Sequence, residues 1–249
     1  MPYHTATFRL LGVEPRPASS AKMLLDDAAK RLGLVVPPSV QEWYECESAI
    51  QILADNSNDD PPIEVAKFAL THWNSKTLLP IRRENQGVCA WAIDLDGSDD
   101  PPVLVDVDTD GRQWHLLART FSEYVYSCVW DYTLVLRQPA LVQAQNPELT
   151  ETAIASLAKL FRPELRTHGW PGNTQYRFGD NQAGILVWAA DEQADWFVGA
   201  ADAETLGLIL AEVWQLDDVG DSLYSCTDLG QQALRAVRGR PARNTTEQS

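Results

Sequence analysis

The chain has 249 residues, of which 45% are hydrophobic, and it contains nine tryptophans, a composition typical of a folded globular protein and unlike that of a disordered chain. Its formal net charge is −15. A surface this acidic repels phosphate backbones, so we do not expect it to bind nucleic acid, and it favours either solubility or a basic protein partner.

Two helices are predicted before any strand. Leu24 and Leu32 belong to an apolar series at i, i+4 and i+8, which predicts a helix over residues 20–34. Ser39 and Glu42 then form a capping-box pattern, which predicts the start of a second, short helix. The residues before the first helix form a separate N-terminal segment in this interpretation.

The middle of the chain alternates apolar and polar residues as β-strands do. The polar segment 55–62 predicts a loop, and Asp110-Gly111 is a strong turn signal. Thr120 and Glu123 form a second capping box in front of a helical apolar pattern. The short connections favour antiparallel pairing, because a parallel crossover needs about a dozen residues or more. The expected strands cover residues 77–81, 88–95, 103–107 and 113–118.

After about residue 139 the same kinds of element begin again. A shift of about 82 residues places Val103 on Ile185 and Trp114 on Trp196, so the order strand, strand, helix occurs twice and is consistent with an internal repeat. We predict an α+β fold with an antiparallel or mixed sheet flanked by helices. The expected divisions are an N-terminal segment 1–19, a domain 20–138, an α+β extension 139–235 and a disordered tail 236–249.

In the second half, the expected helices cover residues 150–161 and 202–214, and the expected strands cover residues 175–178, 185–189 and 195–200.

The sequence contains no motif of a catalytic or cofactor site. Asp106 to Gly111 matches the start of an EF-hand loop, but Leu117 stands where that loop requires glutamate, so a hairpin turn explains the pattern better. The four histidines lack metal-ligand spacing, and no P-loop, G-x-G-x-x-G or G-x-S-x-G motif is present. We therefore expect no metal, no cofactor and no enzymatic activity, although a carboxylate-based hydrolase stays a third alternative.

The cysteines and the apolar segments indicate the compartment. Because the cysteines form no CxxC pair and lie in apolar stretches, we expect buried, reduced thiols rather than a zinc site or disulfides. The N-terminus lacks a signal-peptide pattern, and no apolar stretch approaches the ~20 residues that span a bilayer. We therefore expect a cytoplasmic protein without membrane contact. The cysteines are Cys46, Cys89, Cys128 and Cys226.

Four segments resemble the SUKH superfamily, the Smi/Knr-like fold. They are Val35 to Tyr44 (VVPPSVQEWY), Glu84 to Gly87 (ENQG), Asp99 to Val103 (DDPPV) and Ala118 to Val125 (ARTFSEYV). The resemblance covers roughly residues 20–135. The chain departs from the family at residues 47–50, where many members have an Asn-Gly pair. The resemblance implies a non-enzymatic binding protein, either an immunity protein that occludes a toxin, often a nuclease, or a regulatory scaffold.

These observations lead to one hypothesis about the binding surface. A nuclease presents a basic cleft, and an acidic protein associates quickly with such a partner through electrostatic steering. We expect a basic toxin domain as the partner, bound by the acidic hairpins and by one or two tryptophan anchors; a scaffold without a toxin partner is the alternative. The expected partner-binding residues are Trp73, Trp91, Asp94, Asp96, Asp99, Asp100, Asp106, Asp108 and Asp110.

Overall fold

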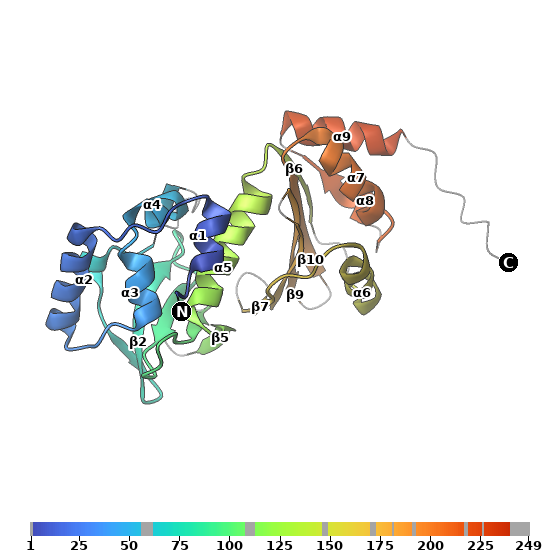
Figure 1. Ribbon diagram of the computed structural model, residues 1–249. Helices are drawn as coiled ribbons and strands as arrows, with labels where there is room; N and C mark the ends of the chain where they lie inside the picture. Colours follow the sequence, from blue (N-terminus) through green and yellow to red (C-terminus); the bar gives the residue numbers. More distant parts are fainter. Residues whose placement is uncertain are drawn as a thin grey trace. The chain divides into compact units, whose positions relative to one another are not determined.

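The computed structural model of the chain has the predicted α+β architecture (Figure 1). It divides into two compact units, Met1–Thr133 with Leu165–Tyr176, and Leu134–Glu164 with Arg177–Ser249, here called the N-terminal and C-terminal units. The structure describes residues 2–55, 62–107, 113–145, 149–169, 173–180, 182–190, 193–216, 219–225 and 227–239, with backbone alone for 52–55.

The N-terminal unit contains a five-stranded sheet in which each strand pairs antiparallel with the next. Four of these strands were predicted. The first was not, because it is only three residues long and forms a hairpin whose turn residues Asn74 and Ser75 adopt positive φ. The strands are β1 (Thr71–Trp73), β2 (Lys76–Arg83), β3 (Ala90–Asp94), β4 (Val103–Asp106) and β5 (Trp114–Ala118).

One face of this sheet packs against helices to form the main core of the unit. Leu79, Ile93 and Val105 from the strands share this core with Trp43 and Phe121 from the helices. The opposite face forms a smaller apolar cluster composed of strand residues. The helices are α1 (Thr5–Leu11), α2 (Ser19–Leu32), α3 (Pro38–Tyr44), α4 (Glu47–Asp55) and α5 (Phe121–Asp131), with a short 3-10 turn η1 (Val65–Lys67).

The predicted capping box at the second helix is wrong. Helix α3 begins at Pro38, whose fixed φ suits the first helical position, and Pro37 occupies the capping position without a side-chain bond. Ser39 is therefore already inside the helix, where its side chain is fully buried. At α5 the N-cap half of the predicted capping box is confirmed, because the Glu123 backbone N–H donates to Thr120 Oγ1 at 3.1 Å; the Glu123 side chain accepts from the backbone N–H of Arg119.

The helix predicted over 20–34 is confirmed as α2, but one member of its predicted apolar series, Leu24, does not face the core. Ala21, Leu25 and Ala28 face the core, while Leu24 is 51% exposed. Within the described part of the N-terminal unit, helices α1 and α4 were not predicted. The expected loop 55–62 lies mostly outside the described residues.

The C-terminal unit contains most of a six-stranded sheet. The strand order of the whole sheet is β11-β6-β10-β9-β8-β7. Residues Leu165–Tyr176, which include β7 and the start of β8, belong to the N-terminal unit. Helices α7 and α9 pack on each other, α7 also on β10 and α9 also on β6. The elements are β6 (Ala140–Ala144), α6 (Glu151–Leu160), β7 (Thr167–His168), β8 (Thr174–Gly179), β9 (Ala183–Ala190), β10 (Gln193–Ala200), α7 (Ala203–Val213), α8 (Val219–Ser222), β11 (Leu223–Tyr224) and α9 (Asp228–Arg238), after a π-helical turn η2 (Tyr132–Leu136).

Two predicted boundaries differ from the structure. Segment 1–19 is part of the N-terminal unit, because α1 contributes Phe8 to its core. The tail predicted from residue 236 begins inside a helix, since α9 runs to Arg238 and buries Val237. Residues 240–249 lie outside the described part of the chain.

The strand–strand–helix order predicted twice is found twice. The hairpin β4–β5 precedes α5, and the hairpin β9–β10 precedes α7, about 82 residues later. Both helices have a side-chain N-cap, Thr120 in α5 and Asp202 in α7. The two hairpins differ in register, because β4–β5 contains a bulge.

Candidate functional site

The N-terminus of the chain is fixed to helix α3 by one carboxylate. Glu42 accepts the backbone N–H of Tyr3 at 2.7 Å and that of His4 at 3.1 Å. Both N–H groups lie just before the first turn of α1, where backbone donors lack partners inside the helix. Glu42 therefore both caps α1 and joins it to α3. We call Tyr3, His4, Ser39 and Glu42 the N-terminal clasp.

The His4 side chain connects the clasp to the hydrophobic core. Its ring is fully buried, and its centroid lies 5.4 Å from that of Trp43 and 5.7 Å from that of Phe121. Nε2 donates to the Ser39 carbonyl at 2.9 Å, whereas the buried Nδ1 has no partner within the described residues. Burial lowers the pKa of His4, and the Ser39 carbonyl and the Glu42 and Asp100 carboxylates oppose this effect only in part.

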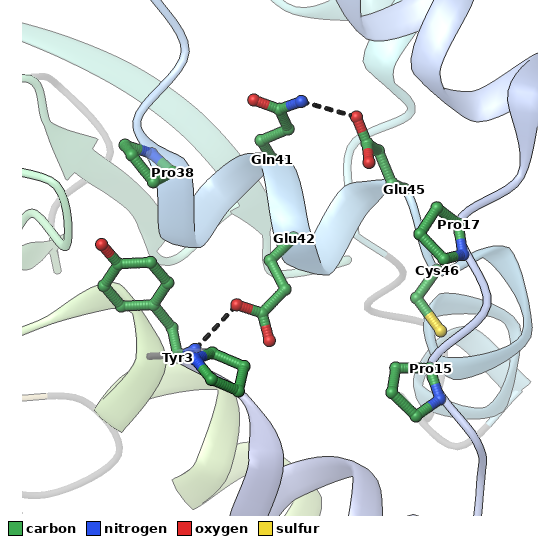
Figure 2. Close-up of a pocket in the computed structure, with 9 residues that line it drawn as sticks. Tyr3, Pro15, Pro17, Pro38, Gln41, Glu42, Glu45 and Cys46 are labelled. Carbon is green, nitrogen blue, oxygen red and sulfur yellow. Dashed lines mark hydrogen bonds between the residues drawn. The ribbon is translucent and has the colours of Figure 1, made fainter.

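A surface hollow of about 450 Å³ lies beside the clasp, and we call it the N-terminal groove. Figure 2 shows Glu42 between Tyr3 on one side and Pro15 and Pro17 on the other. A second hollow of about 420 Å³ shares Pro2, Pro15 and Glu42 with it. The residues that line the groove are Pro2, Tyr3, Pro15, Pro17, Pro38, Gln41, Glu42, Glu45 and Cys46.

The groove is apolar, and the charged residues that line it within the described part of the chain are acidic. Glu42 lies on α3 and Glu45 is the residue that ends this helix, and among the described residues no lysine, arginine or histidine lines the groove. Partial burial and the negative charges of Asp99, Asp100 and Glu42 raise the pKa of Tyr3. The negative potential therefore extends from the groove to the acidic loop that follows β3.

The acidic loop, residues 96–100, is held against the helices by its own side chains. Asp96 accepts the backbone N–H of Ser98 at 3.0 Å and closes a turn. Asp100 accepts the backbone N–H of Ser122 at 3.0 Å and its hydroxyl at 2.5 Å, which fixes the start of α5. The carboxylate of Asp99 is different: it is exposed and lies 3.5 Å from the hydroxyl of Tyr3.

The contrast between these neighbours leads to a stability prediction. Asp100→Ala is expected to destabilise the N-terminal unit by about 1–2 kcal/mol, because it removes two charge-assisted bonds at a helix N-terminus. Asp99→Ala is the matched control and should change stability by less than about 0.5 kcal/mol. Urea denaturation of both variants measures the difference, and equal effects would contradict this division of roles.

Three of the predicted partner-binding residues are buried, which corrects the prediction. Trp91 lies in the core with the Arg82 guanidinium 4.9 Å from its ring centroid. Asp94 forms an ion pair with Lys76, and Asp106 is 1% exposed. The prediction assumed that one face of the hairpin was open to solvent, whereas every residue of β3 and β4 is buried.

The other predicted residues are distributed as follows. Asp99 lies beside Tyr3 and Asp100 at the start of α5, whereas Asp96 closes the turn of the acidic loop through Ser98. Trp73 is half-buried against the apolar cluster on the second face of the sheet. Asp108 and Asp110 lie outside the described residues.

Sequence reasoning did not find the groove. The available signals were the prolines at positions 15, 17 and 38 and the i, i+3 spacing of Glu42 and Glu45, which places both carboxylates on one face of a helix. The contact with Tyr3 was not visible in the sequence, because Tyr3 and Glu42 are 39 positions apart.

Comparisons with known proteins supply no further assignment. No family model, curated protein or solved structure gives a significant match to the chain. Among the described residues, no three His, Cys, Asp or Glu side chains are grouped so that they could hold a metal ion. In the same part of the chain, no helix has the length and apolarity needed to cross a membrane.

Proposed function

We propose that this chain is a non-enzymatic binding protein that engages a basic protein partner through the face formed by the N-terminal groove and the acidic loop. One observation carries the proposal: every charged side chain that lines the groove is a carboxylate, and Asp99 extends the same charge to the exposed loop. Charges of one sign around an apolar hollow attract an oppositely charged protein and leave it apolar surface to cover.

The biological role that we propose is immunity, in which the bound partner is a toxin whose basic active-site cleft is occluded. The net charge of −15 supports fast, steered association with such a cleft. The SUKH resemblance supports the same role. Two of the segments that carry it, residues 35–44 and 118–125, include α3 and the start of α5, which hold the clasp and the acidic loop. A regulatory scaffold that binds a basic partner other than a toxin is the alternative.

The contacts of Glu42 favour binding over hydrolysis. A general base takes up a proton, and a protonated carboxyl group accepts hydrogen bonds more weakly than a carboxylate does. Both oxygens of Glu42 already accept backbone N–H groups. The most central carboxylate of the groove is thus used to hold the fold, which argues against the carboxylate-based hydrolase.

The test begins with affinity capture of the partner from the native host, followed by association kinetics. Glu14→Lys with Asp99→Lys is expected to slow association about tenfold at low salt and to flatten its salt dependence, because Glu14 is an exposed carboxylate of the second hollow beside the groove and Asp99 is the exposed carboxylate of the acidic loop. Asp100 is left unchanged, since it fixes α5.

The matched control is Asp27→Lys with Glu64→Lys, which makes the same charge change at exposed positions that do not line the groove. Equal slowing by both pairs would contradict the placement of the interface and would leave only a general charge effect. Toxin activity in the presence of the chain then separates immunity from scaffolding: inhibition is expected for immunity, and a partner without toxic activity would contradict that role.

A further inference from the structure

The groove shows what kind of group it can accept. Four prolines line it, and proline has no backbone N–H to offer. Among the other lining side chains, the carboxylates of Glu42 and Glu45 only accept hydrogen bonds at neutral pH. A complementary ligand must therefore bring hydrogen-bond donors, positive charge and an apolar stem.

Glu45 is the acceptor best placed for such a ligand. Its side chain is only 12% exposed, and Oε1 accepts from Gln41 Nε2 at 2.7 Å. Lys22 Nζ lies 3.6 Å from the same oxygen, but its side chain is 51% exposed. Within the described residues, Oε2 accepts no hydrogen bond. A largely buried carboxylate thus has one oxygen open and only a weakly held cation nearby.

We propose that the N-terminal groove receives an arginine side chain of the protein partner. Its guanidinium faces the open oxygen of Glu45, and its methylene groups lie along the prolines that line the groove. This inference rests on the proposed function, because it names the group by which the partner is recognised.

Arginine fits better than lysine for two reasons. Its guanidinium is more weakly hydrated than an ammonium group, so it loses less on entering an apolar groove. It also offers several donors, which can reach an open carboxylate oxygen and the Gln41 side-chain oxygen together. The hollow of about 450 Å³ is within the range of ligand sites, so one side chain and part of its backbone can enter.

The test titrates the full chain with N-acetyl-L-arginine amide and follows backbone amide resonances. We expect saturable shifts at Tyr3, Gln41, Glu45 and Cys46. N-acetyl-L-citrulline amide has nearly the same shape without the charge, and it should bind at least about tenfold more weakly, as loss of charge-assisted hydrogen bonds predicts. Glu45→Gln should weaken arginine binding to a similar extent, whereas the exposed control Glu64→Gln should not.

A second variant tests the same site by an expected increase in affinity for the arginine probe. Lys22→Gln removes the cation beside Glu45, so the arginine probe should bind about two- to fivefold more tightly, which damage to the fold would not produce. Equal binding of the two probes, shifts confined to other residues, or no saturable shift would overturn the inference. None of these results bears on whether the chain captures a basic partner, so failure here and failure of the proposed function are distinguishable.

Discussion

Gly199→Ala is expected to destabilise the C-terminal unit by about 3 kcal/mol, because the added methyl group would meet backbone that cannot move aside. Gly199 lies in β10, paired with Leu141 of β6 and Gly184 of β9. A Cβ atom there would lie 2.5 Å from the carbonyl oxygen of Val135 and 2.7 Å from its Cα. The close approach of η2 to the sheet therefore requires glycine.

Gly207→Ala is the matched control and should have the opposite sign. Gly207 lies inside α7, and a Cβ atom at this position would meet no atom within 4 Å. Because alanine is the better helix former, this variant should gain about 0.5–1 kcal/mol.

Amide hydrogen exchange in β10 and α7 measures both variants within the C-terminal unit, which matters because the two units need not unfold together. Destabilisation by Gly207→Ala, or no effect of Gly199→Ala, would contradict the packing described for these strands and helices.

The parts of the fold that could be predicted are those specified by residues near each other in the sequence. The strands from 88 to 118 follow from alternation and short turns. The start of α5 follows from Thr120 and Glu123, which are three residues apart. The repeat was visible for the same reason, since each copy contains its own strands, turn and cap.

The parts that could not be predicted depend on partners far away in the sequence. Helix α1 has seven residues and no side-chain cap of its own, so its local signal is weak. What holds it is Glu42, together with the burial of His4 and Phe8 against Trp43. A capping-box pattern at Ser39 and Glu42 suggested a local role for this glutamate, whereas its actual bonds reach back to the N-terminus.

The predicted acidic binding surface included too many carboxylates, again because the sequence does not show which side chains are bonded within the fold. Counting carboxylates treats each as solvated, but Asp94 pairs with Lys76 and Asp100 caps α5. Charges committed to such bonds cannot attract a partner as strongly as free ones. Asp99, which sequence alone does not separate from Asp100, is the exposed carboxylate of the pair. Only the structure distinguishes the carboxylates that build the fold from those that face solvent.

The clasp leads to the second large effect, a dependence of stability on pH that originates at His4. The folded state holds this ring neutral, because burial lowers its pKa below the value of 6.5 expected for an exposed histidine. The unfolded chain therefore binds the proton more readily. It follows that the stability contributed by neutral His4 is fully present above about pH 6.5 and is lost as the pH falls.

His4→Gln isolates this contribution. Glutamine can donate from Nε2 to the Ser39 carbonyl as histidine does, but it does not titrate. Below pH 6.5 the wild-type chain should lose stability relative to this variant by up to about 1.4 kcal/mol for each pH unit. Urea denaturation between pH 8 and pH 5 gives the difference curve, and common effects of the carboxylates cancel in it.

His115→Gln is the control, because it makes the same substitution at an exposed position in β5, outside the clasp. A difference curve for His4→Gln that is flat across this range would show that the ring is not held neutral. If the curve falls as expected, protonation of His4 should also disturb Tyr3, which lines the groove. The backbone N–H groups of both residues donate to the same Glu42 carboxylate. Acid would then weaken arginine binding in the wild-type chain more than in His4→Gln, although neither probe nor groove contacts the imidazole.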